Sequence, residues 1–335
     1  MESPTPSRRT SRAGGLAGKL TLAAAATLLT LLAAEAAFRI FGIGPPPPGL
    51  EVPGVETGGP DERRNTLGFR GPEWTPEPAA GVRRVEFLGD SFTYGRGVPE
   101  DRIFASIAAA RLSAGGAPVE AVNISKPGWD TADEVEALKT VGLPLDPDLV
   151  VVVFFLNDAT HLDSNPVIAW RMNREINRRD GVLNRISRLY DTWDWIRRRR
   201  RVAAETLRDY KESYLGSPDH QVLWERCKTA LADGKQACDA RGVPIAVVIF
   251  PMLLELNEDH PFRDVHERVA EACKAIGVPV LDLLPAFEGE DGPSLWIAPD
   301  NAHPDDRGHK IAGEAIARFI TDSGLLSARR ERANS

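Results

Sequence analysis

Short apolar runs alternate with longer amphipathic stretches along most of the chain after residue 82. The apolar runs are rich in Val and Ile and have the length of buried strands, at residues 85–88, 119–124, 149–155, 245–250 and 278–283. The amphipathic stretches between them predict helices, at residues 103–112, 132–140, 221–240, 264–276 and 306–320. This alternation predicts an α/β fold, with a five-stranded parallel sheet and helices on both of its faces.

A basic and then apolar segment opens the chain. Apolar residues run from position 20 to 34 and continue past Glu35 to Phe38, after four basic residues, Arg8, Arg9, Arg12 and Lys19. Counted through Phe38, the segment is nearly long enough to cross a bilayer, with Glu35 near its outer end, where a charge costs less than at the centre. Ala34-Glu35-Ala36 also fits the small-x-small pattern at which a signal peptide is cleaved. We expect an uncleaved membrane anchor in residues 1–44, with secretion after cleavage as the alternative. In both cases the positive flank predicts that the remainder lies outside the cytoplasm.

Composition divides the rest of the chain. Residues 45–81 are rich in proline and glycine and predict an extended linker with a lead-in turn, residues 82–326 a main domain, and residues 327–335 a tail. Within the main domain, residues 161–214 exceed what the fold needs and carry many arginines with several tryptophans. We expect this insertion to be helical. It would serve as a lid or a patch for anionic lipid or envelope polymer, or it would be a helical hairpin with a solvated basic face.

The totals exclude some classes of function. A net charge of −7 argues against a general nucleic-acid binder. The three cysteines form no cluster with metal-ligand spacing, so we expect no metal and no cofactor. We interpret the cysteines as buried free thiols, with a disulfide between Cys238 and Cys273 as the alternative.

Ser91 lies where the first predicted strand ends, in Gly89-Asp90-Ser91. The reactive groups of parallel sheets gather at the carboxyl ends of the strands, so a serine at this turn can expose its hydroxyl above the sheet. The alternative is that Ser91 only caps the following helix. A nucleotide-binding turn is disfavoured, because the stretch has neither GxGxxG nor the lysine of a P-loop.

A serine nucleophile needs a general base, and the base needs a partner that orients it. His303 follows the last predicted strand, and Asp300 precedes it by one turn of chain, close enough for its carboxylate to reach the ring. Two further strand ends carry Gly128 and Asn157. Each could be a simple turn residue, or a donor to the oxyanion that forms when a serine attacks a carbonyl.

The residues at these four strand ends resemble the conserved blocks of the SGNH/GDSL hydrolases. Gly-Asp-Ser-Phe-Thr-Tyr-Gly at 89–95 resembles block I, Gly128 block II, Asn157-Asp158 block III, and Asp300-Asn301-Ala302-His303-Pro304 block V. The lead-in at 67–71 resembles that of bacterial anchored members. The resemblance spans residues 82–326 and implies the three-layer, flavodoxin-like fold of that superfamily.

The resemblance also implies roles for individual residues. Ser91 would be the nucleophile, His303 its base and Asp300 the orienting carboxylate. The oxyanion donors would be the backbone N–H groups of Ser91 and Gly128 and the side chain of Asn157. One departure is Phe155, where the family usually has a glycine two residues before the block III asparagine. We expect this departure to change the shape of the pocket and leave the catalytic groups intact.

The expected function is therefore hydrolysis of an acyl ester, linked to carbohydrate, lipid or a small molecule, through an acyl-enzyme. Two alternatives stay open. One is an O-acyltransferase that uses the same serine to modify an envelope glycan. The other is a non-catalytic glycan-binding scaffold on the same fold, which a complete set of catalytic residues disfavours.

Overall fold

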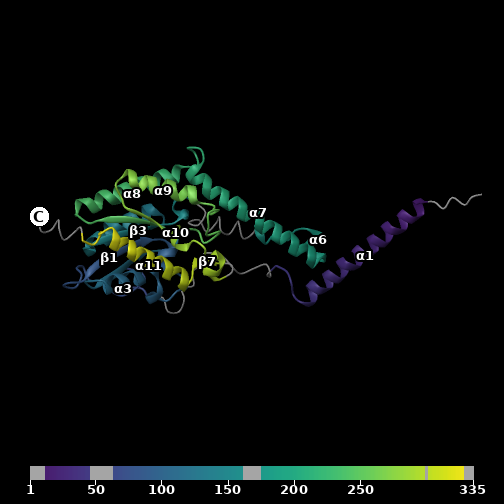
Figure 1. Cartoon of the computed structure of the whole chain (residues 1–335), viewed down its shortest axis with the longest axis horizontal. Helices are drawn as coiled ribbons and strands as arrows, with labels where there is room; N and C mark the ends of the chain where they lie inside the picture. The colour runs from purple at the N-terminus through teal and green to yellow at the C-terminus, as the bar shows by residue number, and fades with distance from the viewer. Residues whose placement is uncertain (1–11, 46–62, 161–174, 299–300, 328–335) are drawn as a thin grey trace, which may run out of the picture. The chain divides into compact units, whose positions relative to one another are not determined.

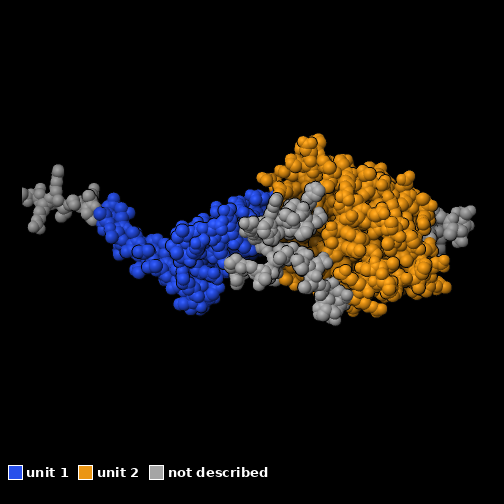
Figure 2. All heavy atoms as spheres, turned by 180° about the vertical axis from the view of Figure 1, so that it is seen from behind, with its two compact units in different colours: residues 1–53, 170–205 blue, residues 54–169, 206–335 orange. Residues whose placement is uncertain are grey.

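A computed structural model describes residues 12–45, 63–160, 175–298 and 301–327. The chain forms two compact units, which Figure 2 distinguishes by colour. Unit 1 contains residues 1–53 and 170–205, and unit 2 contains residues 54–169 and 206–335. The sheet and every residue of the candidate site lie in unit 2.

The sheet of unit 2 has five parallel strands in the order β2-β1-β3-β4-β5. The strands are β1 (Arg83–Gly89), β2 (Val119–Ser125), β3 (Leu149–Phe154), β4 (Ile245–Ile249) and β5 (Val280–Asp282). Every residue of β3 is buried, which explains its uninterrupted apolar sequence. The predicted five-stranded parallel sheet is confirmed, with strand ends that differ from the prediction by at most two residues.

Helices cover both faces of the sheet (Figure 1). On one face Val150 and Val152 pack with side chains of α4 (Thr131–Ala137), α8 (Val222–Ala240) and α9 (Arg263–Ala275). On the other face Val151 and Val153 pack with side chains of α3 (Phe104–Ala114) and α11 (Asp306–Asp322). Because successive residues of a strand point to opposite faces, a single β-branched run builds both cores.

Short elements connect this framework. They are α2 (Ser91–Tyr94), η1 (Glu100–Arg102), the π-helical turn η2 (Leu138–Gly142), η3 (Leu143–Leu145), η4 (Leu156–Ala159), α10 (Leu284–Phe287) and η5 (Gly292–Leu295). An antiparallel pair, β6 (Trp296–Ala298) and β7 (Asn301–Pro304), precedes α11. The apolar pattern did not predict this pair, because strands this short carry too little periodicity. β7 matters for function because it contains His303.

Unit 1 is helical. α1 (Arg12–Ile40) includes a 25-residue stretch, Leu16–Ile40, that is long and apolar enough to cross a membrane, with a mean hydropathy of 1.8. α6 (Val182–Ile186) and α7 (Arg188–Leu215) come from the insertion, and the first part of α7 belongs to this unit. Residues 161–174 of the insertion lie outside the described part of the chain.

All three cysteines are free and buried, as the sequence interpretation expected. Burial raises the pKa of Cys238 and of Cys273 to about 12, and it raises that of Cys227 further. The Cys227 thiol donates to the backbone oxygen of Asp158 over 3.0 Å. The three side chains therefore act as small apolar core residues.

Trp224 gives a direct test of the core on the α8 face. Its side chain is 1% exposed and contacts the rings of Phe154 and Tyr214, with centroids 6.1 and 5.3 Å away. We expect Trp224→Ala to lower the free energy of unfolding by about 3–5 kcal/mol, because the substitution leaves a large cavity. Chemical denaturation of the purified protein measures the change. Val222→Ala is the matched control on the same helix, because Val222 is 64% exposed and should change stability by less than about 0.5 kcal/mol. Equal losses in the two variants would contradict this packing.

Candidate active site

A tight turn after β1 presents Ser91. A side chain at Gly89 would put its Cβ 1.9 Å from Thr93 Oγ1, so only glycine allows α2 to start this close to the strand. Asp90 is the N-cap of α2, and its Oδ1 accepts a hydrogen bond from Phe92 N over 2.9 Å. Asp90 therefore performs the capping role that was the alternative interpretation of Ser91. The hydroxyl of Ser91 is left for other contacts.

Arg70, a residue that the sequence interpretation did not single out, holds the far end of α2. Its buried guanidinium donates to the backbone oxygens of Tyr94, at 2.9 Å, and Gly95, at 2.5 Å, and also to that of Val98. Helix ends leave carbonyl groups without partners inside the helix, and these bonds satisfy them. The only sequence signal for this role was the lead-in turn that contains Arg70.

His303 meets Ser91 from β7. Its Nε2 lies 2.7 Å from Ser91 Oγ, although the two residues are 212 positions apart. Its ring contacts that of Phe92, which stacks on Phe155 at 3.9 Å between centroids. Burial, together with the charge of Arg96, lowers the pKa of His303 from 6.5 to about 4. The imidazole is thus neutral at pH 7 and can accept the serine proton.

The other ring nitrogen of His303 faces an amide oxygen. Asn301 Oδ1 lies 2.5 Å from His303 Nδ1, and the two side chains share one face of β7 because their positions differ by two. An amide oxygen only accepts hydrogen bonds, so Nδ1 carries the hydrogen and Nε2 presents its lone pair to Ser91. Sequence analysis missed this contact. The signal available was the two-residue spacing. The predicted orienting residue, Asp300, lies outside the described residues and stays a prediction.

Asp90 connects Asn157 to Ser91. Asn157 Nδ2 donates to Asp90 Oδ2 over 2.8 Å, and the same oxygen lies 3.5 Å from Ser91 Oγ. An amide nitrogen has two hydrogens, and this bond uses one of them. Tyr214, in the last turn of α7, fixes η4 by donating its hydroxyl to the backbone oxygen of Leu156 over 2.8 Å.

Gly128 follows β2, the strand next to β1 in the sheet. The register pairs Gly89 with Ser125, and Lys126 N donates to Gly89 O over 3.3 Å, which brings this loop beside the nucleophile turn. Gly128 has a φ of +80°, and no atom lies within 4 Å of the point that a Cβ would occupy. Its backbone is therefore open to an approaching ligand, in a conformation that favours glycine.

Two further carboxyl groups lie buried behind the site. Desolvation raises the pKa of Glu134, and the charges of Asp158 and Asp90 raise it further. Desolvation also raises the pKa of Asp158, whose Oδ2 accepts a hydrogen bond from Thr131 Oγ1 over 2.8 Å. The negative charge of Asp90 is among the causes that raise both pKa values.

Residues 87–311, more than half of the chain, match the GDSL-like Lipase/Acylhydrolase family. The chain belongs to this family. The expected SGNH/GDSL superfamily is confirmed, and with it the enzyme class, an SGNH-type ester hydrolase.

Two solved esterase structures are similar to this chain at low sequence identity. The acetylxylan esterase Axe2 of Geobacillus stearothermophilus is 15% identical, with a TM-score of 0.44 over 71% of this chain and 94% of its own. The psychrotrophic esterase EstA of a Pseudoalteromonas species is 12% identical, with a TM-score of 0.44 over 72% of this chain and 97% of its own. Among curated proteins, none matches the chain significantly.

The low pKa of His303 predicts how kcat/KM of this GDSL-like hydrolase depends on pH on the acid side. With neutral His303 as the expected base, kcat/KM should stay constant as the pH falls from 7 and decline only near pH 4, where His303 takes up a proton. Chromatographic measurement of p-nitrophenol released from p-nitrophenyl acetate gives the profile. A midpoint at or above 6.5 would contradict the prediction, because it would mean that the folded protein does not disfavour the protonated ring.

Unfolding has to be followed in the same pH series. The folded-state pKa values of His303, about 4, and of buried His309, about 3, lie below the ordinary 6.5. As the pH falls from 6.5 towards these values, the unfolded chain binds protons that the folded chain does not, so the free energy of unfolding decreases. Circular dichroism at each pH separates this loss of structure from titration of the active base.

Proposed function

We propose that this hydrolase cleaves acyl esters with Ser91 as its nucleophile and His303 as its general base. The observation that carries the proposal is the 2.7 Å contact between His303 Nε2 and Ser91 Oγ, made by an imidazole that is neutral at pH 7. The tautomer set by Asn301 supports it, because the lone pair then faces the hydroxyl. Asp300 is proposed as the carboxylate that stabilises the imidazolium formed during the reaction.

The reaction has two steps. His303 takes the Ser91 proton while Oγ bonds to the ester carbonyl carbon, and the C–O bond of the leaving alcohol then breaks as His303 returns the proton to it. Water then attacks the acyl-enzyme, with His303 again taking and returning a proton, which releases the acid and free Ser91. We assign the oxyanion to the N–H groups of Ser91 and Gly128 and to Asn157 Nδ2. Loss of one such donor typically costs on the order of 10²–10³ in kcat.

Water is the proposed acyl acceptor because the family is one of acylhydrolases. An O-acyltransferase would run the same first step and pass the acyl group to a sugar hydroxyl. Product analysis with both acceptors present distinguishes the two reactions. A non-catalytic scaffold is disfavoured by the contact between Ser91 and His303. We propose carbohydrate- or lipid-linked esters as substrates, because the proposed anchor would expose the enzyme to the cell envelope.

The nucleophile can be tested without knowledge of the substrate. A fluorophosphonate probe should label the wild-type protein and fail to label Ser91→Ala, and Ser91→Ala should lower kcat/KM on p-nitrophenyl acetate by on the order of 10³ or more. Ser91→Ala combined with His303→Ala should cost little beyond Ser91→Ala alone, because the two groups act as one unit. Ser323→Ala, an exposed serine on the surface, is the matched control and should keep full labelling. Full esterase activity in Ser91→Ala would refute the mechanism.

We also propose that α1 stays in the mature protein as a membrane anchor. Its apolar stretch Leu16–Ile40 has the length of a span, and basic residues precede it. Glu35 supports retention, because it makes hydrogen bonds to residues 187–189, and cleavage after Ala36 would remove them.

Expression of the full chain in a bacterial host with a C-terminal tag tests the anchor. The mature protein should retain the residues before Ala36. It should also stay in the membrane fraction after alkaline treatment, because a spanning helix resists extraction. Intact mass measurement reads the result. A chain with Ala34→Val and Ala36→Val, which removes the cleavage pattern, serves as the size standard. A mature N-terminus at Ala37 in the unmodified chain would exclude the anchor.

A further inference from the structure

The carboxylate of Glu35 in α1 caps the start of another helix, α7. Its Oε1 accepts from Arg188 N over 2.8 Å, and its Oε2 accepts from Leu189 N over 2.9 Å and from the Ser187 hydroxyl over 2.8 Å. Ser187 Oγ in turn accepts from Tyr190 N over 3.1 Å. The first backbone N–H groups of α7 are thereby satisfied, and the partner of two of them lies more than 150 positions away in the chain.

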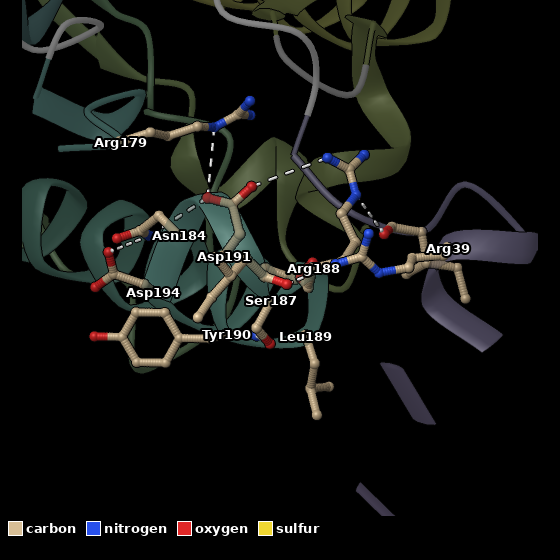
Figure 3. A network of polar contacts seen from close by, with 12 residues as sticks. Arg39, Arg179, Asn184, Ser187, Arg188, Leu189, Tyr190, Asp191 and Asp194 are labelled. Atoms are coloured by element: carbon tan, nitrogen blue, oxygen red, sulfur yellow. Dashed lines mark hydrogen bonds and ion pairs between the residues drawn. The ribbon is translucent and has the colours of Figure 1, made fainter. Parts of the chain in front are cut away.

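Arg39 completes this junction. Its Nε donates to Glu35 Oε1 over 2.6 Å, and its Nη2 donates to the backbone oxygen of Ile186 over 2.6 Å. Figure 3 shows Arg39 beside Ser187, Arg188 and Leu189. The charge of Glu35 is therefore balanced by a guanidinium and by the positive end of a helix. The end of α1 and the end of α6 are held side by side.

Polar side chains join α6 to α7, as Figure 3 shows for Asn184, Asp191 and Asp194. Asn184 Nδ2 donates to Asp194 Oδ2 over 3.0 Å, and Arg198 pairs with the same carboxylate at 2.8 Å. Asp191, 3% exposed, pairs with Arg179 at 3.5 Å. Asp191 and Asp194 are thus paired inside unit 1, on the face of α7 opposite Trp193 and Ile196.

The exposed side of these two helices carries large apolar side chains. Val182, Leu183 and Ile186 of α6 are 70, 51 and 60% exposed, and Trp193 and Ile196 of α7 are also exposed. Exposed apolar side chains that gather on one surface are unfavourable in water. Their exposure here therefore indicates that this surface is covered by a partner. Ile40 and Phe41 at the end of α1 are exposed too, and the Arg39 contact joins them to the same surface.

Basic groups border these apolar side chains. Arg185, Arg199 and Arg200 are exposed, and the Arg197 guanidinium lies 5.5 Å from the centroid of the Trp193 ring. Aliphatic and Trp side chains bordered by arginines are typical of helices that lie in the boundary between lipid headgroups and acyl chains.

The position of Glu35 along α1 identifies what covers the surface. Glu35 lies about 29 Å along the helix from Leu16, at 1.5 Å per residue, and the hydrocarbon core of a bilayer is about 30 Å thick. With α1 as a span, Glu35 reaches the outer boundary of the core, and its hydrogen bonds hold the start of α7 at that level.

We propose that α6 and the beginning of α7 lie on the outer surface of the bilayer that α1 crosses. Val182, Leu183 and Ile186 enter the headgroup boundary, the neighbouring arginines contact lipid phosphates, and Glu35 fixes the two helices to the anchor. The proposal commits to phospholipid as the occupant of this surface. It rests on the proposed anchor and assigns a function to the part of the insertion that the structure describes.

Depth-dependent quenching tests the contact with lipid. Full-length chains with Val182→Cys or Ile186→Cys carry a thiol-reactive fluorophore in vesicles of phosphatidylcholine and phosphatidylglycerol. The native thiols are buried and, with raised pKa values, react poorly, so the label goes to the introduced cysteine. Nitroxide-labelled lipid should quench both positions several-fold more than Ala240→Cys, an exposed reference on α8, and to an extent comparable with Ala24→Cys in α1.

The outcomes separate this inference from the anchor. Quenching at Ala24→Cys with none at 182 and 186, where aqueous iodide quenches instead, keeps the anchor and overturns the inference. A label at 186 shielded from both quenchers would mean that protein covers this face, and that also overturns it. Absence of lipid quenching at Ala24→Cys would reject the anchor and the inference together.

The Glu35 contact has its own test. Glu35→Ala should reduce lipid quenching at Ile186→Cys several-fold and leave Ala24→Cys unchanged, because α7 loses the acceptor for its first N–H groups. Thr30→Ala is the matched control in α1, since the Thr30 hydroxyl bonds only to its own helix, at Ala26 O. Unchanged quenching at 186 in Glu35→Ala would show that Glu35 does not hold the two helices together.

Discussion

The active site depends on one constraint, which is that all five strands of the sheet run parallel and are packed by helices on both sides. Parallel strands all end at the same edge of the sheet, and the segments that follow them bring polar groups together there. The Ser91 turn after β1, the Gly128 loop after β2 and η4 after β3 are therefore neighbours. His303 reaches them from β7, immediately before the helix that covers one face of the sheet.

Asp90 links two of the loops that form the site. One carboxylate caps α2 through Phe92 N and accepts the amide of Asn157. It thereby fixes the distance between the turn with the proposed nucleophile and the loop with a proposed oxyanion donor. A buried carboxyl group needs hydrogen-bond partners, and Phe92 N and Asn157 Nδ2 supply them here.

The sheet and its helices could be predicted from the sequence because buried strands read as apolar runs and packed helices as amphipathic ones. The residues at the strand ends could be predicted because glycine, serine and histidine stand out against apolar surroundings. The contact of Asn301 with His303 was missed, because the two-residue spacing is a weak signal beside an aspartate that is the more usual partner of a catalytic histidine. Phe155, noted as a departure from the family, stacks on Phe92 beside the His303 ring. Contacts across long separations, such as Arg70 with the end of α2 or Glu35 with α7, leave no periodicity and need three-dimensional structure.

The lead-in before β1 is as much a part of the enzyme as the strands. Phe69 stacks on Trp74 and meets the edge of Trp129 near Gly128, while Asn65 accepts the backbone N–H groups of Leu67 and Phe69. A truncated chain that started at β1 would leave the carbonyls at the end of α2 without the Arg70 donor and would open a gap beside Trp129. The shortest active fragment should therefore begin ahead of Asn65, and a recombinant soluble form of the enzyme has to keep that segment.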